Sequence, residues 1–184
     1  MPLTDQERQE LQTLAKKIRR HIADVTGWSG GAHIGGALSM VDILTLLYWK
    51  YMKVDPANPK WVDRDRLVLS KGHGGVGHAV VLAHKGYFNP EELRKFNETG
   101  SMLGMHLDSL KVPGCEASTG SMGHGLPQAV GMALGARVLK KDWKVYCIIG
   151  DGESNEGSIW EAAMSASHYK LDNLCAIVDK NGMQ

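Results

Sequence analysis

The sequence predicts an α/β domain in which a parallel β-sheet is flanked by helices. Residues 144–149 and 174–178 are short apolar runs of strand length, and a helix-length segment, residues 158–169, separates them. A strand, a helix and a second strand in this order form a βαβ unit, whose crossover is right-handed. Residues 66–69 form a further candidate strand nearer the N-terminus, so the same alternation continues there.

The composition is that of one globular domain. The chain has 184 residues, of which 43% are hydrophobic and 22% are charged, and no repeat or linker divides it. Its formal net charge of +1 provides no overall field for nucleic acid or for an anionic membrane, so we expect neither as a partner. No stretch approaches the ~20 apolar residues of a membrane span, and the first residues do not form a signal peptide. We therefore expect a cytoplasmic location.

The cysteines predict no disulfide framework and no zinc site. Cys115, Cys147 and Cys175 are odd in number and show no CxxC spacing. Two of them lie in the apolar runs of the predicted strands. Buried, reduced thiols are the expected state.

The N-terminal third predicts two helices. Thr4 and Glu7 form a candidate capping box for a helix whose apolar positions recur every three or four residues, at Leu11, Leu14, Ile18, Ile22 and Val25. The glycine-rich residues 27–36 are expected to end it. Ser39 is the expected N-cap of a second helix that runs to Tyr51.

The remaining elements follow from local signals. Helices are expected near residues 76–85 and 126–140. Asn89 and Pro90 have the pattern of an N-cap followed by a first-turn proline, which predicts a short helix ending near Asn97. In the helix over residues 158–169, the small apolar positions Ile159, Ala162, Ala163 and Ala166 form one face that suits close packing on a sheet. Both strands that flank this helix are expected to be buried.

Oxygen-bearing side chains follow both of these strands. Asp151 lies in the glycine-rich loop of residues 150–157, and Asn181 lies in the loop of residues 179–183. The carboxyl ends of neighbouring parallel strands share one edge of the sheet, where ligands collect. Carboxylate and amide oxygens suit magnesium, and glycines let the backbone approach a phosphate closely. The Gly-Asp-Gly tripeptide alone is equally compatible with an ordinary turn.

The two loops together resemble the thiamine diphosphate signature. In proteins with that signature, the Asp, the Asn and a main-chain oxygen two residues beyond the Asn hold the magnesium ion. Here the resemblance implies Asp151, Asn181 and the main-chain oxygen of Met183 as metal ligands, with thiamine diphosphate and Mg²⁺ as cofactors.

The rest of the chain is similar to the amino-terminal, diphosphate-binding half of transketolase, in the form whose two halves are separate chains. Residues 29–36 resemble the family's SGHPGAP segment, and residues 65–74 resemble DRFVLSNGH. Residues 104–106 correspond to GHP, and residues 118–125 resemble TTGPLGQG. The order of these segments makes the resemblance specific. It implies a thiamine diphosphate-binding domain of the PP type, incomplete at the C-terminus.

The resemblance also implies roles for individual residues. His33, His73 and His106 would be catalytic, since histidine titrates near neutrality and can move protons. The residues expected to bind the cofactor are His73, Gly120, Met122, Gly150, Asp151, Gly152, Glu156 and Asn181. Glu156 and Glu161 match acids of a glutamate network at the family's dimer interface, although both also fit a solvated helix face. His124 replaces a family Gln. Other residues are expected to be structural, namely His21, His78, His84, His168, Trp143 and Trp160.

The implied activity is the transfer of a two-carbon ketol unit from a ketose phosphate to an aldose phosphate, as in the pentose phosphate pathway. The family continues beyond Gln184, so residues 1–184 are expected to be a truncated domain or a short natural subunit. The pyrimidine-binding domain is expected on a separate chain, so a C-terminal transketolase subunit is the expected partner, in a dimer of the pair. We expect no turnover without it. Alternatives are 1-deoxyxylulose-5-phosphate synthase, a 2-oxoacid dehydrogenase alpha subunit, or a non-catalytic fragment.

Overall fold

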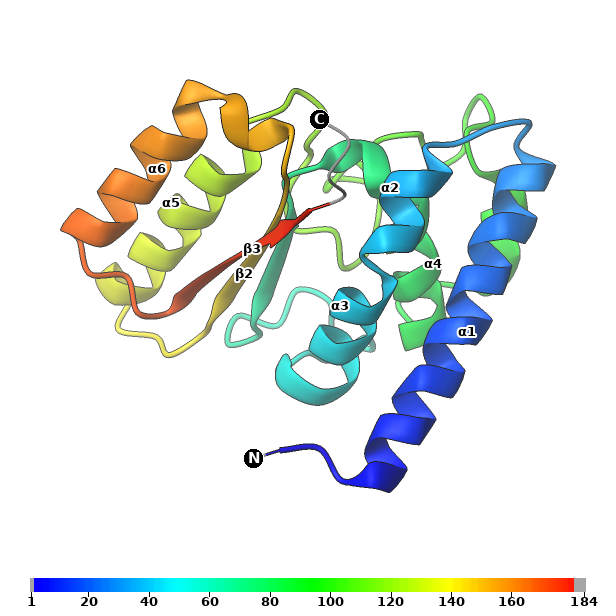
Figure 1. The fold of residues 1–184 in the computed structure, drawn as a ribbon, viewed down its shortest axis with the longest axis horizontal. Helices are drawn as coiled ribbons and strands as arrows, with labels where there is room; N and C mark the ends of the chain where they lie inside the picture. Colours follow the sequence, from blue (N-terminus) through cyan, green and yellow to red (C-terminus); the bar gives the residue numbers. More distant parts are fainter. Residues whose placement is uncertain (1, 181–184) are drawn as a thin grey trace.

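The computed structural model describes residues 2–180 and contains a parallel three-stranded sheet (Figure 1). The strands are β1 (Arg66–Leu69), β2 (Val145–Gly150) and β3 (Leu174–Asp179), and their order in the sheet is β1-β2-β3. Both pairs are parallel. The predicted α/β class and the predicted strands are therefore confirmed. None of the helices in this part of the chain is long and apolar enough to cross a membrane.

Helices cover both faces of the sheet, with α1 to α4 on one side and α5 and α6 on the other (Figure 1). Successive strand residues point to opposite faces, so alternate residues enter two separate cores. Leu67 and Ile148 belong to the core under α1 to α4, whereas Val68 and Cys147 belong to the core under α5 and α6. The strand ends are thereby held between two helical layers.

Helix α1 (Asp5–Trp28) begins with the predicted capping box, in which the Thr4 hydroxyl accepts from the Glu7 amide and the Glu7 carboxylate accepts from the Thr4 amide. Its buried face consists of Ala15, Ile18, Ile22 and Val25. This face packs against α4 (Gly75–Lys85), whose residues 75–83 are all buried. An apolar helix covered on all sides is a core element.

The predicted second helix differs from the observed one. Helix α2 (Ile34–Ser39) starts five residues before Ser39, and α3 (Val41–Leu46) continues into the π-helical turn η1 (Leu47–Tyr51). Ser39 is therefore the last residue of α2 and not an N-cap. The low helix propensity of Gly35 and Gly36 explains why sequence alone did not place a helix there, and α2 packs against α4.

The C-terminal layer contains α5 (Gly125–Val138) and α6 (Gly157–His168). Three short 3-10 turns complete the fold, η2 (Gly72–Gly74), η3 (Pro90–Lys95) and η4 (Glu153–Asn155). The predicted cap of η3 is confirmed, since the Asn89 side chain accepts from the Glu91 amide. In α6, Ile159 and Ala162 are buried as predicted, but Ala163 is exposed.

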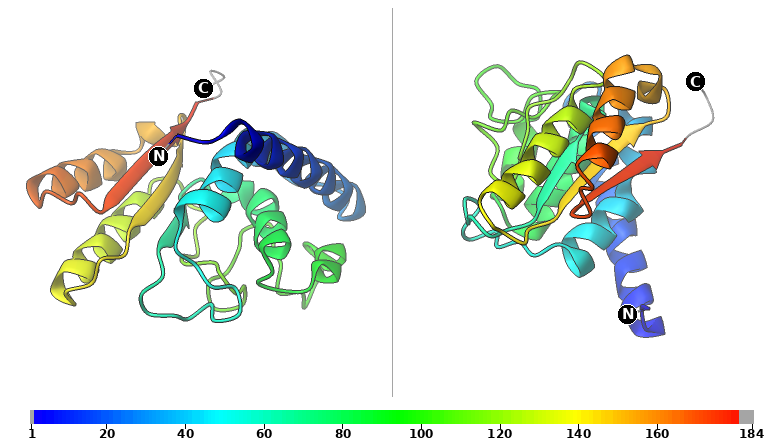
Figure 2. Two further views of the ribbon diagram at one scale, coloured as in Figure 1. Left: turned by 90° about the horizontal axis from the view of Figure 1, so that it is seen from below. Right: turned by 90° about the vertical axis from the view of Figure 1, so that its left-hand side faces the viewer.

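Strand β3 lies at the edge of the sheet (Figure 2), and the prediction that it is buried is wrong. Cys175 is exposed, as is 54% of Val178. An edge strand has a neighbour on one side only, which apolar composition alone does not reveal. Trp160 is also exposed (63%), contrary to the packing role predicted for it, whereas Trp143 is buried and stacks on Arg66. Cys115 and Cys147 are buried thiols, as expected.

His78 gives a first testable prediction. Its ring is buried in α4 and its Nε2 lies 2.9 Å from the Tyr48 hydroxyl, and burial lowers its pKa to about 4. The unfolded chain, with a pKa near 6.5, then binds more protons than the folded chain between these values. Stability is expected to fall by about 2 kcal/mol as the pH drops from 7 to 5.

Urea unfolding of wild type and His78→Gln at both pH values measures this effect. The glutamine keeps a hydrogen-bonding group beside Tyr48 but does not titrate, so its stability should depend less on pH. Equal pH dependence in the two proteins would show that His78 does not contribute.

Candidate functional site

The loops that follow β2 and β3 start side by side. Gly150 and Asp179 are partners in the parallel register, and the Asp151 amide donates to the Asp179 carbonyl at 3.3 Å. The Asp151 carboxylate accepts from the Gly152 amide at 3.1 Å. Asn181 and Met183, the other two predicted metal ligands, lie outside the described residues. The shared edge that the sequence predicts for Asp151 and for the start of the second loop is confirmed.

A buried carboxylate joins three segments at this edge. Glu153 is 1% exposed. Its Oε1 accepts from the Ser70 hydroxyl at 2.5 Å and from the Gly123 amide at 2.8 Å, and its Oε2 accepts from the Gly150 amide at 3.0 Å. The ends of β1 and β2 and the loop before α5 therefore meet at one side chain.

Two glycines, one at the start of α5 and one in the loop before it, are packed too closely for side chains. A Cβ on Gly125 would lie 2.4 Å from the Cα of Ser70, and a Cβ on Gly123 would lie 2.4 Å from the Ser158 hydroxyl. Gly123 also has a φ of 83°, a region that glycine adopts without strain. The Thr119 hydroxyl donates to the Leu69 carbonyl at 2.6 Å. This loop, which carries Gly120 and Met122, is thus fixed against the end of β1.

Two glycines of α5 allow a direct test of this packing. Gly125→Ala should destabilise the protein by ~1–3 kcal/mol, because its methyl group overlaps the backbone of Ser70. Gly131→Ala, in the same helix with nothing within 4 Å of the added Cβ, should stabilise it by ~0.5–1 kcal/mol. Urea unfolding measures both, and a neutral Gly125→Ala would contradict the packing described.

A second polar network joins the segment after β1 and the end of β3 to α2. The Lys71 ammonium lies 2.5 Å from the Asp179 carboxylate, and the Ser39 hydroxyl donates to the same carboxylate oxygen at 2.6 Å. The Lys71 side chain is 5% exposed and that of Asp179 is 10% exposed. Removing one partner of such a pair leaves a buried charge unpaired, which is strongly destabilising. This network links the end of β3 to the segment after β1, across the end of β2.

The three predicted catalytic histidines form a cluster, although they come from three distant segments. The ring centroids of His33 and His73 are 5.7 Å apart, and those of His33 and His106 are 6.4 Å apart. His33 precedes α2, His73 lies in η2 after β1, and His106 lies in the loop between η3 and α5. The imidazoles of His33 and His106 are solvent-exposed, whereas His73 is half-buried. A ligand can therefore reach the cluster from solvent.

His73 is the histidine whose titration the surroundings change. Its burial lowers the pKa, and the positive charge of Lys71 lowers it further, while the nearby Glu153 carboxylate opposes the shift. A pKa below the ordinary value of about 6.5 keeps the ring neutral at pH 7. Neutral imidazole can both donate and accept a hydrogen bond, as a proton-transfer group requires.

The other predicted cofactor residues lie around this cluster and the β2 edge. Gly120 faces His106, and a Cβ on Gly120 would lie 3.2 Å from the imidazole. Met122 is 40% exposed. Glu156 is exposed at the N-cap of α6, next to the loop before α5. Glu161 is exposed further along the same helix.

Five residues whose side chains form the two networks were not predicted as site residues, namely Ser39, Ser70, Lys71, Glu153 and Asp179. Each lies inside or beside a motif that was recognised, and Asp179 begins the loop of Asn181. A charged residue that directly follows a strand or a glycine-rich turn is the signal that could have identified Glu153 and Lys71. Ser39 has no such signal, because its partner is 140 positions away.

The donor chemistry at this edge fits a diphosphate with a hard cation. Asp151 supplies a carboxylate, the ligand type that magnesium prefers, and it is flanked by two glycines that add no side chain beside it. Within residues 2–180, no group of three or more His, Cys, Asp or Glu side chains is arranged to hold a metal ion. The described residues therefore provide one ligand of the predicted metal set.

The remaining predicted structural histidines lie away from the cluster. His21 and His84 join α1 to α4 through ring nitrogens 3.0 Å apart, and burial lowers the pKa of both. His168 is exposed at the end of α6 and its ring contacts Tyr169. His78 is the buried partner of Tyr48 described above.

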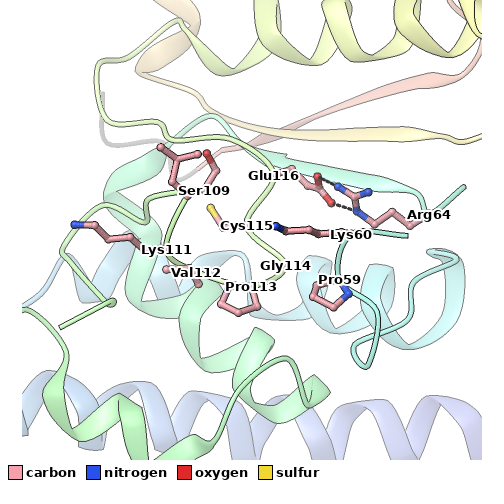
Figure 3. A pocket seen from close by; sticks show the side chains of 11 residues that line it. Pro59, Lys60, Arg64, Ser109, Lys111, Val112, Pro113, Gly114, Cys115 and Glu116 are labelled. Atoms are coloured by element: carbon pink, nitrogen blue, oxygen red, sulfur yellow. Dashed lines mark hydrogen bonds and ion pairs between the residues drawn. The ribbon is translucent and has the colours of Figure 1, made fainter. Parts of the chain in front are cut away.

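A separate cavity of about 340 Å³ lies between the segment before β1 and the loop of residues 109–116 (Figure 3). Arg64 and Glu116 form a two-pronged ion pair in its wall, at 2.7 and 2.6 Å. Burial raises the pKa of the Cys115 thiol to about 12, so this thiol is protonated and unreactive. The cavity shares no lining residue with the predicted site.

Comparison with known proteins identifies the family of this chain. Residues 11–184 match the family described as the transketolase thiamine diphosphate binding domain. The 6-deoxy-6-sulfo-D-fructose transketolase subunit SqwG of Clostridium sp. (strain MSTE9) is 49% identical over 175 residues, which are 95% of this chain and 64% of the relative. An apulose-4-phosphate transketolase subunit of Phocaeicola vulgatus is 45% identical over 95% of this chain and 62% of its own length.

Solved structures agree with the sequence match. The transketolase from Leishmania mexicana superposes with a TM-score of 0.91 at 32% identity, over 95% of this chain and 28% of that chain. The transketolase from Campylobacter jejuni superposes with a TM-score of 0.90 at 34% identity, over 100% and 29%. The chain spans less than two thirds of the length of the relatives it matches. The matched sequence shows the family and the fold agrees with it, so the chain belongs to the family of transketolase thiamine diphosphate-binding domains.

Proposed function

We propose that this chain is the thiamine diphosphate-binding part of a transketolase, which transfers a two-carbon ketol unit from a ketose phosphate to an aldose phosphate. The observation that supports this best is the convergence of separate segments on one sheet edge. The three histidines, the Gly150–Gly152 loop and the loop of Gly120 and Met122 gather there. Family membership supports the same cofactor.

The diphosphate would lie on the β2 edge. Asp151 would hold the magnesium ion together with Asn181 and the main-chain oxygen of Met183, and Gly150 and Gly152 would leave space for the phosphates. Glu156 would contribute from the start of α6, and Gly120 and Met122 would contact the rings. When bound, thiamine diphosphate supplies the nucleophilic carbon that takes up the ketol unit.

The histidine cluster would bind the sugar and move protons. His33 and His106 are exposed and can hydrogen-bond the hydroxyls of donor and acceptor. His73, held neutral by its surroundings, can accept a proton from a sugar hydroxyl and return it. The ring centroid of His33 lies 5.7 Å from that of His73 and 6.4 Å from that of His106. The cluster therefore offers three imidazoles that can each donate a proton to the sugar or accept one from it.

A partner chain is part of the proposal. The relatives at 49% and 45% identity are named as transketolase subunits, which indicates that such proteins act together with another chain. We propose that the partner carries the pyrimidine-binding domain and that two such pairs associate. The chain without its partner is expected to show no turnover.

Reconstitution tests the function. The intact protein is mixed with the product of the adjacent reading frame, magnesium and thiamine diphosphate, and ketol transfer to ribose 5-phosphate is measured. The donors are xylulose 5-phosphate, apulose 4-phosphate and 6-deoxy-6-sulfofructose, since the last two appear in the names of the relatives. Transfer from any of them supports the proposal. Carbon dioxide release from pyruvate instead would indicate a synthase or a 2-oxoacid dehydrogenase, and no reaction of either kind would contradict catalysis.

A further inference from the structure

Glu153 places a carboxyl group beside a site that must accept an anion. Its carboxylate is buried and its three hydrogen-bond donors are neutral, two backbone amides and the Ser70 hydroxyl. A buried carboxylate next to a diphosphate raises the electrostatic cost of binding. Attraction of the diphosphate therefore does not explain why a carboxylate lies at this position.

The hydrogen bonds supply that explanation. The Gly123 amide and the Ser70 hydroxyl donate to Oε1, and the Gly150 amide donates to Oε2. A carboxylate only accepts, so it satisfies both sides at once. A glutamine has one acceptor oxygen, and its amide group would face a backbone N–H on one side in either orientation. A glutamate therefore satisfies both loops at this position, and a glutamine does not.

We propose that Glu153 is a positioning residue, which holds the Gly150–Gly152 loop and the Met122–Gly123 loop at the separation that the diphosphate and the rings of thiamine diphosphate require. This role rests on the proposed function. Glu153 contacts neither the reacting atoms nor the phosphates in the proposal, and acts through the two loops.

The substitution Glu153→Gln distinguishes a positioning role from an electrostatic one, because the two roles predict opposite changes in the Kd of thiamine diphosphate. Removing a negative charge should by itself tighten the binding of an anionic cofactor. Positioning predicts the opposite, because one loop loses its anchor and a buried donor is left unsatisfied. We expect the Kd of thiamine diphosphate for the reconstituted complex to rise roughly tenfold or more, and kcat at saturating cofactor to fall much less than the affinity.

Asp65→Asn is the matched control. Asp65 is also a buried carboxylate and accepts from two backbone amides, those of Lys53 at 2.8 Å and Lys144 at 2.7 Å. It lies at the opposite end of the strands, just before β1. Both variants should lower the midpoint of urea unfolding, but only Glu153→Gln should weaken cofactor binding. If Glu153→Gln does not fold, Ser70→Ala removes one donor of the same network, and a few-fold rise in Kd is expected.

Hydrogen exchange of the cofactor-free protein tests the same role without any ligand. Peptides covering residues 118–126 and 148–157 should exchange faster in Glu153→Gln than in wild type, and should be unchanged in Asp65→Asn. If the wild-type complex does not bind thiamine diphosphate, the proposed function fails, and this exchange experiment still decides whether Glu153 holds the loops. Unchanged exchange in both loops, or a Kd that is unchanged or lower in Glu153→Gln, would overturn the proposal.

Discussion

Replacing Asp151 by alanine is expected to abolish ketol transfer by the reconstituted enzyme and to weaken magnesium-dependent binding of thiamine diphosphate by about 100-fold or more. Groups that only orient metal ligands are already worth roughly 10–100-fold in affinity, and Asp151 is proposed as a direct ligand. The fold should survive, because the bond between β2 and β3 at this position uses the Asp151 backbone amide.

Titration calorimetry with thiamine diphosphate, with and without EDTA, measures this effect. Asp172→Ala is the matched control, since Asp172 is an exposed carboxylate just before β3 at the other end of the sheet. It should bind the cofactor like wild type. Wild-type affinity in Asp151→Ala would remove Asp151 from the metal site.

Replacing His73 by asparagine should reduce kcat/KM for ketol transfer by ~10²–10⁴, the usual contribution of a positioned acid or base. Asparagine keeps a polar group of similar reach but cannot carry the proton. The wild-type rate should also fall at acid pH, because the neutral ring is the active form. Burial and the charge of Lys71 lower the pKa of His73, so the fall should begin below the ordinary value of about 6.5.

His168→Asn provides the control, as this histidine is exposed at the far end of α6. Its rate and pH profile should match wild type. An unchanged rate in His73→Asn would show that the cluster binds sugar without transferring protons through His73.

Local sequence signals predict much of the fold, and they predict that the site lies at the sheet edge where β2 and β3 end. The capping box of Thr4 and Glu7, the cap at Asn89 and the apolar run of β2 depend on residues close in sequence, and each is observed. The nearness of Asp151 to the second loop follows from parallel strand order alone. The clustering of His33, His73 and His106 came from the family resemblance, and the structure brings their rings together.

The features that sequence does not predict depend on contacts between distant residues. Ser39 looks like a helix start, but the structure uses its hydroxyl to bind Asp179. Apolar composition suggests that β3 is buried, whereas its position at the sheet edge exposes Cys175. Glu153 resembles a surface acid in a turn until its three donors are known. In each case the outcome depends on a contact with a residue far along the chain or on the order of the strands in the sheet.

A crystal structure of the complex with thiamine diphosphate and Mn²⁺ in place of magnesium tests the central claim most directly. We expect an anomalous peak within ligand distance of the Asp151 carboxylate and the Asn181 side chain, with the diphosphate against Gly150 and Gly152. A metal and diphosphate bound elsewhere, with Asp151 outside the coordination sphere, would contradict the account.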